Sequence, residues 1–330
     1  MIVLGVITVL LVAATIVLTL KLLDQSERHV EAVHGMKVKS ATDAGWAPRD
    51  AELDGVVKAD YDKDPNRTKA GYHADISDKG MRILGKMKNL TNLDLAGCNV
   101  EDDWLQYIQD LHLTRLALSD SEITDRGARM ISKFTDLADL TLARCTKIGD
   151  QGISSFKSLK KLTCLDLEQT QCTNSGVKIL CDNLPNLTVL KLKYTKVTSA
   201  ALADIAKLKN LDDLDLSQNE IDRKDLVHLA GLKKLTKLGL NRCNITDEDI
   251  PFLASLGVNS LGLSSTPITS KGLMILAGTK HIRQIYIEGC PNLTAADVEK
   301  LRQIHPECGV IYSRSDRRLD QLIERYGGLD

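Results

Sequence analysis

The chain has 330 residues, of which 43% are hydrophobic and only 4% aromatic, so it can bury an aliphatic core without disulfides or metals. Its 43 lysines and arginines nearly balance its 44 aspartates and glutamates, for a net charge of −1. This balance excludes the strong positive charge typical of nucleic-acid-binding proteins, and we predict no nucleic-acid partner.

An apolar stretch without charges opens the chain at residues 2–20 (IVLGVITVLLVAATIVLTL), and Leu22 and Leu23 extend it beyond Lys21. A helix of this length crosses the ~30 Å hydrocarbon layer of a membrane. A cleaved signal peptide is the alternative, but it needs a basic segment before an apolar region of about 7–15 residues. We therefore predict a transmembrane anchor over residues 1–23, with contact to the membrane through residues 2–23.

The positive charges next to this stretch all follow it, at Lys21, Arg28, Lys37 and Lys39. The positive-inside rule then places the rest of the chain on the cytoplasmic side of a single-pass membrane protein, although many such anchors export their domain. We expect residues 24–75 to form a juxtamembrane linker and N-terminal cap. This segment should begin as a polar helix, become irregular, and end with a strand in VVKADYD (56–62).

From residue 76 onward the sequence repeats with a period of 23–25 residues. The units begin at Ile76, Val100, Ile123, Ile148, Cys172, Val197, Ile221, Ile245, Ile268 and Leu293. Each carries L-x-x-L-x-L-x-x-[C/N/T/S]. In the first unit, Leu90, Leu93 and Leu95 fit a short strand whose alternate residues turn inward. The preceding ISDKGMRILGKM predicts a helix capped by Ser77 or Asp78.

This pattern resembles the leucine-rich repeat family, in particular its cysteine-containing type, in which I-T-D-x-G opens each helix. The resemblance covers residues 76–313. It implies an α/β solenoid of about ten strand–helix units with parallel strands on its concave side, because one unit cannot bury its apolar face alone. After it, Leu319, Leu322, Ile323 and Tyr326 share one helical face and predict a C-terminal capping helix over residues 314–330.

Small polar residues occupy one column at the end of each predicted strand, here called the ladder column. It comprises Cys98, Ser121, Cys145, Thr170, Thr195, Asn219, Cys243, Thr266 and Cys290. All can hydrogen-bond backbone groups of the turning loop, so cysteine is interchangeable here with threonine, serine and asparagine. Cys98 and Cys145 are two repeats apart, about 10 Å, which is beyond disulfide reach. We interpret the column as structural.

No motif for catalysis, cofactor binding or metal binding occurs. The seven histidines form no H-E-x-x-H pattern, and no phosphate-binding or nucleophile-elbow sequence is present. We predict no enzyme, no cofactor and no metal. The rival hypothesis is an enzyme using the carboxylates of Asp166, Glu168, Asp213 and Asp215, which the intervening Lys191 and Lys193 disfavour.

The predicted concave face concentrates charge in its central repeats. Candidate partner-binding residues on this face are Asp166, Glu168, Lys191, Lys193, Tyr194, Asp215 and Tyr286. Tyr286 ends an uncharged stretch that follows the charged repeats. Two interpretations remain open. Asp166, Lys191 and Asp215 can neutralise one another across strands, at only ~0.2–1 kcal/mol for each pair. Alternatively they form a protein-binding patch around Tyr194, since tyrosine is enriched at interface hot spots.

The resemblance therefore implies a membrane-anchored module that recognises another protein through its concave face. Two alternatives stay open. One is a substrate-recognition adaptor for a ubiquitin-ligase-like degradation machine, as similar repeats form when joined to a helical adaptor module, although none precedes Ile76. The other is an architectural envelope protein, which would tolerate change across the whole concave face.

Overall fold

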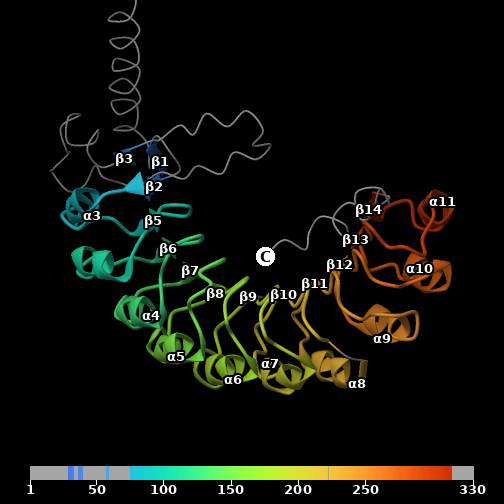
Figure 1. The fold of residues 1–330 in the computed structure, drawn as a ribbon. Helices are drawn as coiled ribbons and strands as arrows, with labels where there is room; N and C mark the ends of the chain where they lie inside the picture. The colour runs from blue at the N-terminus through green and yellow to red at the C-terminus, as the bar shows by residue number, and fades with distance from the viewer. Residues whose placement is uncertain (1–28, 33–35, 40–56, 59–74, 222, 314–330) are drawn as a thin grey trace, which may run out of the picture.

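The computed structural model describes residues 29–32, 36–39, 57–58, 75–221 and 223–313. Ten parallel strands follow one another in chain order and line the inside of an arc, with the helices on its outside (Figure 1). The strands are β5 (Asn92–Asp94), β6 (Arg115–Ala117), β7 (Asp139–Thr141), β8 (Cys164–Asp166), β9 (Val189–Lys191), β10 (Asp213–Asp215), β11 (Lys237–Gly239), β12 (Ser260–Gly262), β13 (Gln284–Tyr286) and β14 (Gly309–Ile311). This arrangement confirms the predicted α/β solenoid.

The convex layer mixes short α-helices with 3₁₀ turns. The α-helices are α3 (Asp78–Leu84), α4 (Asp125–Ile131), α5 (Asp150–Ile153), α6 (Asn174–Asn183), α7 (Leu202–Ile205), α8 (Arg223–Leu226), α9 (Ile250–Ser255), α10 (Ser270–Ala277) and α11 (Ala295–Ile304). The 3₁₀ turns are η3 (Asp102–Tyr107), η4 (Ser154–Ser158), η5 (Ser199–Ala201) and η6 (Val227–Gly231). Only a 3₁₀ turn forms in the unit from Val100, where Glu101 provides no side-chain cap.

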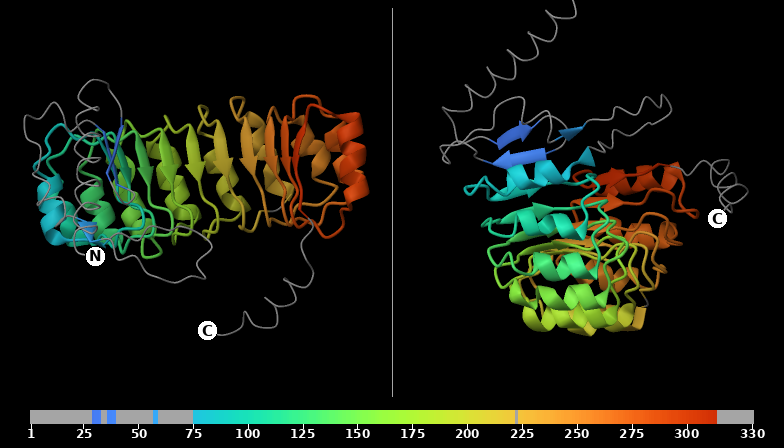
Figure 2. Two further views of the ribbon diagram at one scale, coloured as in Figure 1. Left: turned by 90° about the horizontal axis from the view of Figure 1, so that it is seen from above. Right: turned by 60° about the vertical axis from the view of Figure 1, so that its left-hand side comes forward.

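Leucines build the core in layers that continue from one repeat to the next. In the fourth unit Leu162, Leu165 and Leu167 are all fully buried. The register places Leu165 beside Leu140 on one side and Leu190 on the other. Figure 2 shows these strands side by side along the whole inner surface, so each repeat is covered by its neighbours.

A polar clamp joins the start of several helices to the preceding repeat. Thr173, the N-cap of α6, donates its backbone N–H and its hydroxyl to the carboxylate of Asp150 at 2.9 and 2.5 Å. The same hydroxyl accepts the N–H of Ser175. A Cβ on Gly176 would overlap Asp150 Oδ1 and would lie 3.2 Å from Cys172 Sγ. The glycine of I-T-D-x-G therefore makes room for the aspartate of the preceding unit.

The clamp recurs along the solenoid. Three further sets are Asp102 with Thr124 and Gly127, Asp125 with Gly149 and Gly152, and Asp247 with Thr269 and Gly272. One interface reverses the pattern, since Arg223 takes the aspartate position and the buried Asp249 takes the glycine position. Their closest atoms, Nε and Oδ1, lie 3.8 Å apart. At this interface the residues at both clamp positions, one in each of two neighbouring repeats, differ from the usual aspartate and glycine.

The clamp predicts the effect of adding one methyl group. An exposed helical glycine replaced by alanine normally stabilises a helix by about 1 kcal/mol. Gly176→Ala is instead expected to lower the free energy of unfolding by about 1–3 kcal/mol, because Asp150 must move. In an Asp150→Ala background the same change should cost at least about 1 kcal/mol less. Urea denaturation of the four variants measures this coupling.

Gly257→Ala is the matched control, because a methyl group there meets nothing within 4 Å. It should leave the unfolding midpoint nearly unchanged. Additive effects of the Asp150 and Gly176 changes, or a stabilising Gly176→Ala, would contradict the clamp.

The first parallel strand is covered by an antiparallel hairpin. β1 (His29–Ala32) pairs with β2 (Met36–Lys39), and β2 pairs with β5 through Val38 opposite Leu93. We predicted a polar helix at the start of the linker, but residues 29–32 and 36–39 form strands, whereas residues 24–28 lie outside the described residues. HVEA and MKVK alternate apolar and polar residues, and the open edge of β5 presents backbone groups that a neighbouring strand satisfies.

The strand expected in VVKADYD is present over two residues, but it does not extend the main sheet. β3 (Val57–Lys58) pairs with β4 (Asp75–Ile76) in a separate two-stranded sheet. Within the part of the chain that the structure describes, no helix has the length and apolar character needed to span a membrane. The predicted anchor (1–23) and C-terminal helix (314–330) lie outside the described residues.

Candidate functional site

The ladder column closes each strand from inside the solenoid. All its members are buried except the half-buried Thr195. Cys145 Sγ donates to the carbonyl of Leu118 in the preceding repeat at 3.1 Å, and Thr170 Oγ1 donates to Leu167 in its own repeat at 2.8 Å. Thiols and hydroxyls thus satisfy strand-end carbonyls that have lost contact with water.

The same pattern continues in the other members of the column. Cys243 and Cys290 donate to the preceding repeat, Thr195 and Thr266 donate within their own repeat, and Ser121 donates to the carbonyl of Cys98. The amide of Asn219 reaches carbonyls in both repeats. An asparagine, having two N–H donors, combines the roles of cysteine and threonine.

Thiol chemistry is suppressed at cysteines both inside and outside the ladder column. Burial raises the pKa of Cys145, Cys164 and Cys181 to about 12, and that of Cys243 to about 11. All eight cysteines of the chain lie in the described segments, and none of them forms a disulfide. In those segments no cluster of three or more histidine, cysteine or acidic side chains is arranged to hold a metal. Protonated, buried thiols are poor nucleophiles and poor metal ligands.

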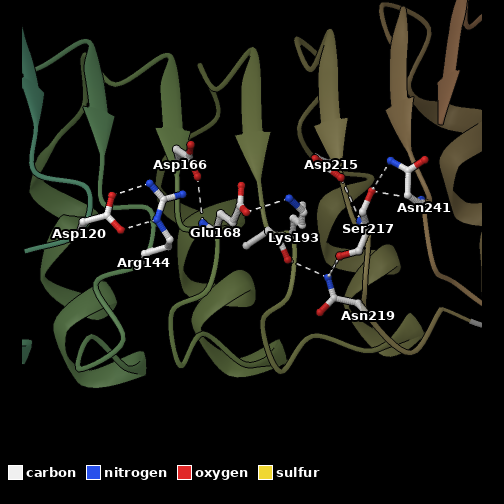
Figure 3. Close-up of polar contacts among 10 residues, drawn as sticks. Asp120, Arg144, Asp166, Glu168, Lys193, Asp215, Ser217, Asn219 and Asn241 are labelled. Carbon is white, nitrogen blue, oxygen red and sulfur yellow. Dashed lines mark hydrogen bonds and ion pairs between the residues drawn. The ribbon is translucent and has the colours of Figure 1, made fainter. Parts of the chain in front are cut away.

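The charged residues of the central repeats do come together on the concave face, but they pair differently from the predicted ladder. The register places Lys191 between Asp166 and Asp215. Its ammonium group nevertheless pairs with Asp213, at 2.5 Å. Lys193 pairs with Glu168 at 2.9 Å, as Figure 3 shows.

The two aspartates beside Lys191 bind backbone groups instead. Asp166 Oδ1 accepts the N–H of Glu168, and Asp215 Oδ1 accepts the N–H of Ser217, both at 2.9 Å. Asp215 also occupies the space above Gly239, where a Cβ would overlap it. These local bonds, two residues along the chain, compete with the ion pairs that the register would allow.

Burial raises the pKa of Asp166 above its usual value, and the nearby carboxylates of Glu168 and Asp215 add to this shift. A carboxyl whose pKa is higher in the folded than in the unfolded state destabilises the fold when it is ionised. This penalty is present at neutral pH and disappears as the pH falls below the unfolded value.

Asp166→Asn is therefore expected to increase the free energy of unfolding at pH 7, because asparagine keeps the bond to Glu168 N–H without the charge. The gain should shrink as the pH falls towards about 4. Urea denaturation at a series of pH values measures it. Asp182→Asn is the control of opposite sign, since Lys207 and Lys178 lower the pKa of Asp182. A loss of stability in Asp166→Asn at pH 7 would contradict the argument.

Tyr286, the last candidate, lies half-buried on β13, three strands beyond β10. The structure does not bring it together with Tyr194. Tyr194 follows β9 and is 58% exposed, the joint highest exposure of the large hydrophobic side chains in the described segments. The two candidate tyrosines therefore belong to different repeats, four strands apart in the sheet.

Left-handed backbone conformation recurs directly before each ladder residue, in what we call the left-handed column. Its members are Gly97, Asp120, Arg144, Gln169, Tyr194, Gln218, Arg242, Ser265 and Gly289, with φ between 52° and 76°. Glycine adopts this conformation freely, whereas other residues lose roughly 1–2 kcal/mol. Tyr194, with φ of 52°, is bulky and therefore an outlier among such residues.

A groove opens beside Tyr194 at the C-terminal ends of β9, β10 and β11. Its volume is about 640 Å³, and Tyr194, Gln218 and Arg242 of the left-handed column line it together with Lys196 and Glu220. Sequence analysis missed Gln218 and Arg242. The signal that could have found them is a large or charged residue at a position where two repeats carry glycine.

Comparison with known proteins places this geometry in a family. Leucine-rich repeat models match residues 185–245 in one case and residues 86–103 and 109–132 in another. The chain belongs to the leucine-rich repeat family. No curated protein sequence matches it. The matched segments all lie within the repeats found by periodicity.

Solved structures of leucine-rich repeat proteins share the fold. An internalin from Listeria monocytogenes is 23% identical with a TM-score of 0.54, over 71% of this chain and 64% of that chain. Internalin C2 from the same organism is 22% identical with a TM-score of 0.42, over 71% of this chain and 84% of that chain. This chain thus spans less than two thirds of the first internalin. At 23% identity the likeness to the first internalin concerns the fold alone. Leucine-rich repeats are typical of protein–protein interaction modules, and nothing in the described residues indicates catalysis.

Proposed function

We propose that this leucine-rich repeat chain is a protein-recognition module that docks a partner on its concave face, with Tyr194 as the anchor. The observation that carries the proposal is the exposure and the backbone conformation of Tyr194. Its ring is 58% exposed, its backbone is left-handed, and in the described residues its side chain forms no hydrogen bond. Strain of this kind persists where the surrounding fold imposes it, and it clusters at binding sites.

The surroundings of Tyr194 are suited to docking. The Lys193–Glu168 and Lys191–Asp213 ion pairs orient four charged side chains in the same and neighbouring repeats. Such pre-organisation reduces the side-chain entropy lost on binding. A tyrosine at the centre of a polar surface contributes apolar contact area while the ion pairs provide specificity.

A photocrosslinking experiment tests the docking face. p-Benzoyl-phenylalanine is placed at position 194 in one variant and at position 227 in another, in the full chain. Val227 is the matched control, because it is also 58% exposed but lies on the convex side, in η6. A protein should crosslink at position 194 and not at 227. The same adducts at both positions would contradict concave docking.

The partner identified in this way should bind Tyr194→Ala at least about tenfold more weakly than the wild type, which is the loss expected for a hot-spot residue. Affinity measurements with the purified partner give this ratio. Tyr194→Gly separates binding from folding, since glycine removes the left-handed strain and should leave the chain at least as stable. Full affinity in both variants would end the proposal for Tyr194.

Membrane attachment through residues 2–23 is the second element of the proposal, with the repeats on the cytoplasmic side. The length of the apolar stretch and the lysines and arginine after it support this arrangement. Eight cysteines without a disulfide are also typical of proteins in a reducing compartment. A C-terminal tag should resist protease in sealed cells and be cut once the membrane is opened. Immediate cleavage would place the repeats outside.

A further inference from the structure

The left-handed column contains two arginines, and one of them, Arg144, has a carboxylate partner in the structure. Arg144 forms a two-pronged ion pair with the carboxylate of Asp120, which occupies the same column one repeat earlier (Figure 3). Asp120 and Arg144 are partly exposed. A planar guanidinium pairs with a carboxylate in this way because its N–H groups match the two oxygens.

Arg242 has the same backbone setting without the carboxylate. Its backbone N–H donates to the carbonyl of Ser264 in the next repeat at 2.8 Å, as the N–H of Arg144 donates to that of Glu168 at 2.7 Å. The residue one repeat earlier is Gln218. Its backbone N–H also donates to a carbonyl of the next repeat, as the N–H of Asp120 does. Among the described residues, the Arg242 side chain forms neither a hydrogen bond nor an ion pair, although Glu220 lines the same groove.

The groove therefore offers a carboxylate position between Arg242 and Tyr194. Gln218 lies between them in the column, and its amide can both donate and accept. Lys196 adds a second cation to the lining, against the one carboxylate of Glu220. Charge on the lining thus favours an acidic ligand over a basic one.

Two repeats separate Tyr194 from Arg242, which at the spacing of parallel strands is about 10 Å. An extended peptide advances ~3.3 Å for each residue, so three residues cover this distance. The left-handed column is thus matched to a linear segment that crosses the repeats, with one contact at the aromatic ring and one at the guanidinium.

We propose that the groove binds an extended, acidic peptide segment of a partner protein. An aspartate or glutamate side chain of the segment pairs with Arg242, as Asp120 pairs with Arg144. An apolar side chain about three residues away packs on the ring of Tyr194. This inference rests on the proposed function, because it assumes docking at Tyr194, and it specifies the chemistry of the partner.

Selection from a phage library of random linear peptides tests the inference on the full chain in detergent micelles. The peptides are fused to the coat protein through their C-termini, so only side chains supply carboxylates. Selected peptides should carry aspartate or glutamate at a constant distance from an aromatic or leucine residue. Replacing that acidic residue by its amide should weaken binding at least about tenfold.

A double-mutant cycle assigns the carboxylate to its partner. Arg242→Gln should weaken binding of the acidic peptide at least about tenfold, and the amide peptide should then bind this variant no worse than the acidic one. Lys233→Gln is the control, because Lys233 is exposed and lies outside the groove. The Lys233→Gln variant should bind the acidic peptide with the same affinity as the wild type.

The outcomes separate this inference from the proposed function. Peptides that lose affinity with Tyr194→Ala but not with Arg242→Gln would overturn the carboxylate site and leave concave docking intact. Peptides that bind both variants like the wild type would overturn both. Selection of neutral or basic peptides, or of none, would also overturn the inference.

Discussion

Each repeat buries its leucines only against the repeats on either side, and every other feature depends on this stacking. The register that puts Leu165 between Leu140 and Leu190 also aligns all other columns of the solenoid. A side chain therefore meets the residue in the same column one repeat away more often than its neighbours in the sequence. The consequence is a protein whose polar contacts are mostly spaced by 22–27 residues.

Polar contacts of this spacing explain why some columns are uniform and others vary. In the ladder column each residue must satisfy a buried carbonyl, so only small donors occur there. In the clamp, the aspartate of one repeat fills the space that a side chain on the glycine of the next repeat would need. At one interface Arg223 replaces the aspartate and Asp249 replaces the glycine. These columns are constrained by burial, and no ligand is needed to account for them.

The left-handed column differs from these two, because its side chains are exposed or half-buried and glycine would suit its backbone best. Asp120 and Arg144 satisfy each other, whereas Tyr194, Gln218 and Arg242 are left available beside a groove. Function in a repeat protein is expected where the chain departs from what stacking requires. The proposed docking site is the place where three members of this column, Tyr194, Gln218 and Arg242, line a groove.

The sequence by itself determined the period, the order and direction of the strands, the leucine core and the ladder column, because all of these follow from one residue pattern repeated at constant spacing. It also placed Asp166, Lys191 and Asp215 side by side. Which ion pairs form was decided only by the tertiary structure, since Lys191 is long enough to reach Asp213 and both aspartates bind nearby N–H groups. The hairpin over β5 and the space shared by Asp150 and Gly176 were likewise decided in three dimensions. Periodicity states which residues are neighbours, but the volume between neighbours and the backbone torsion at Tyr194 exist only in the folded chain.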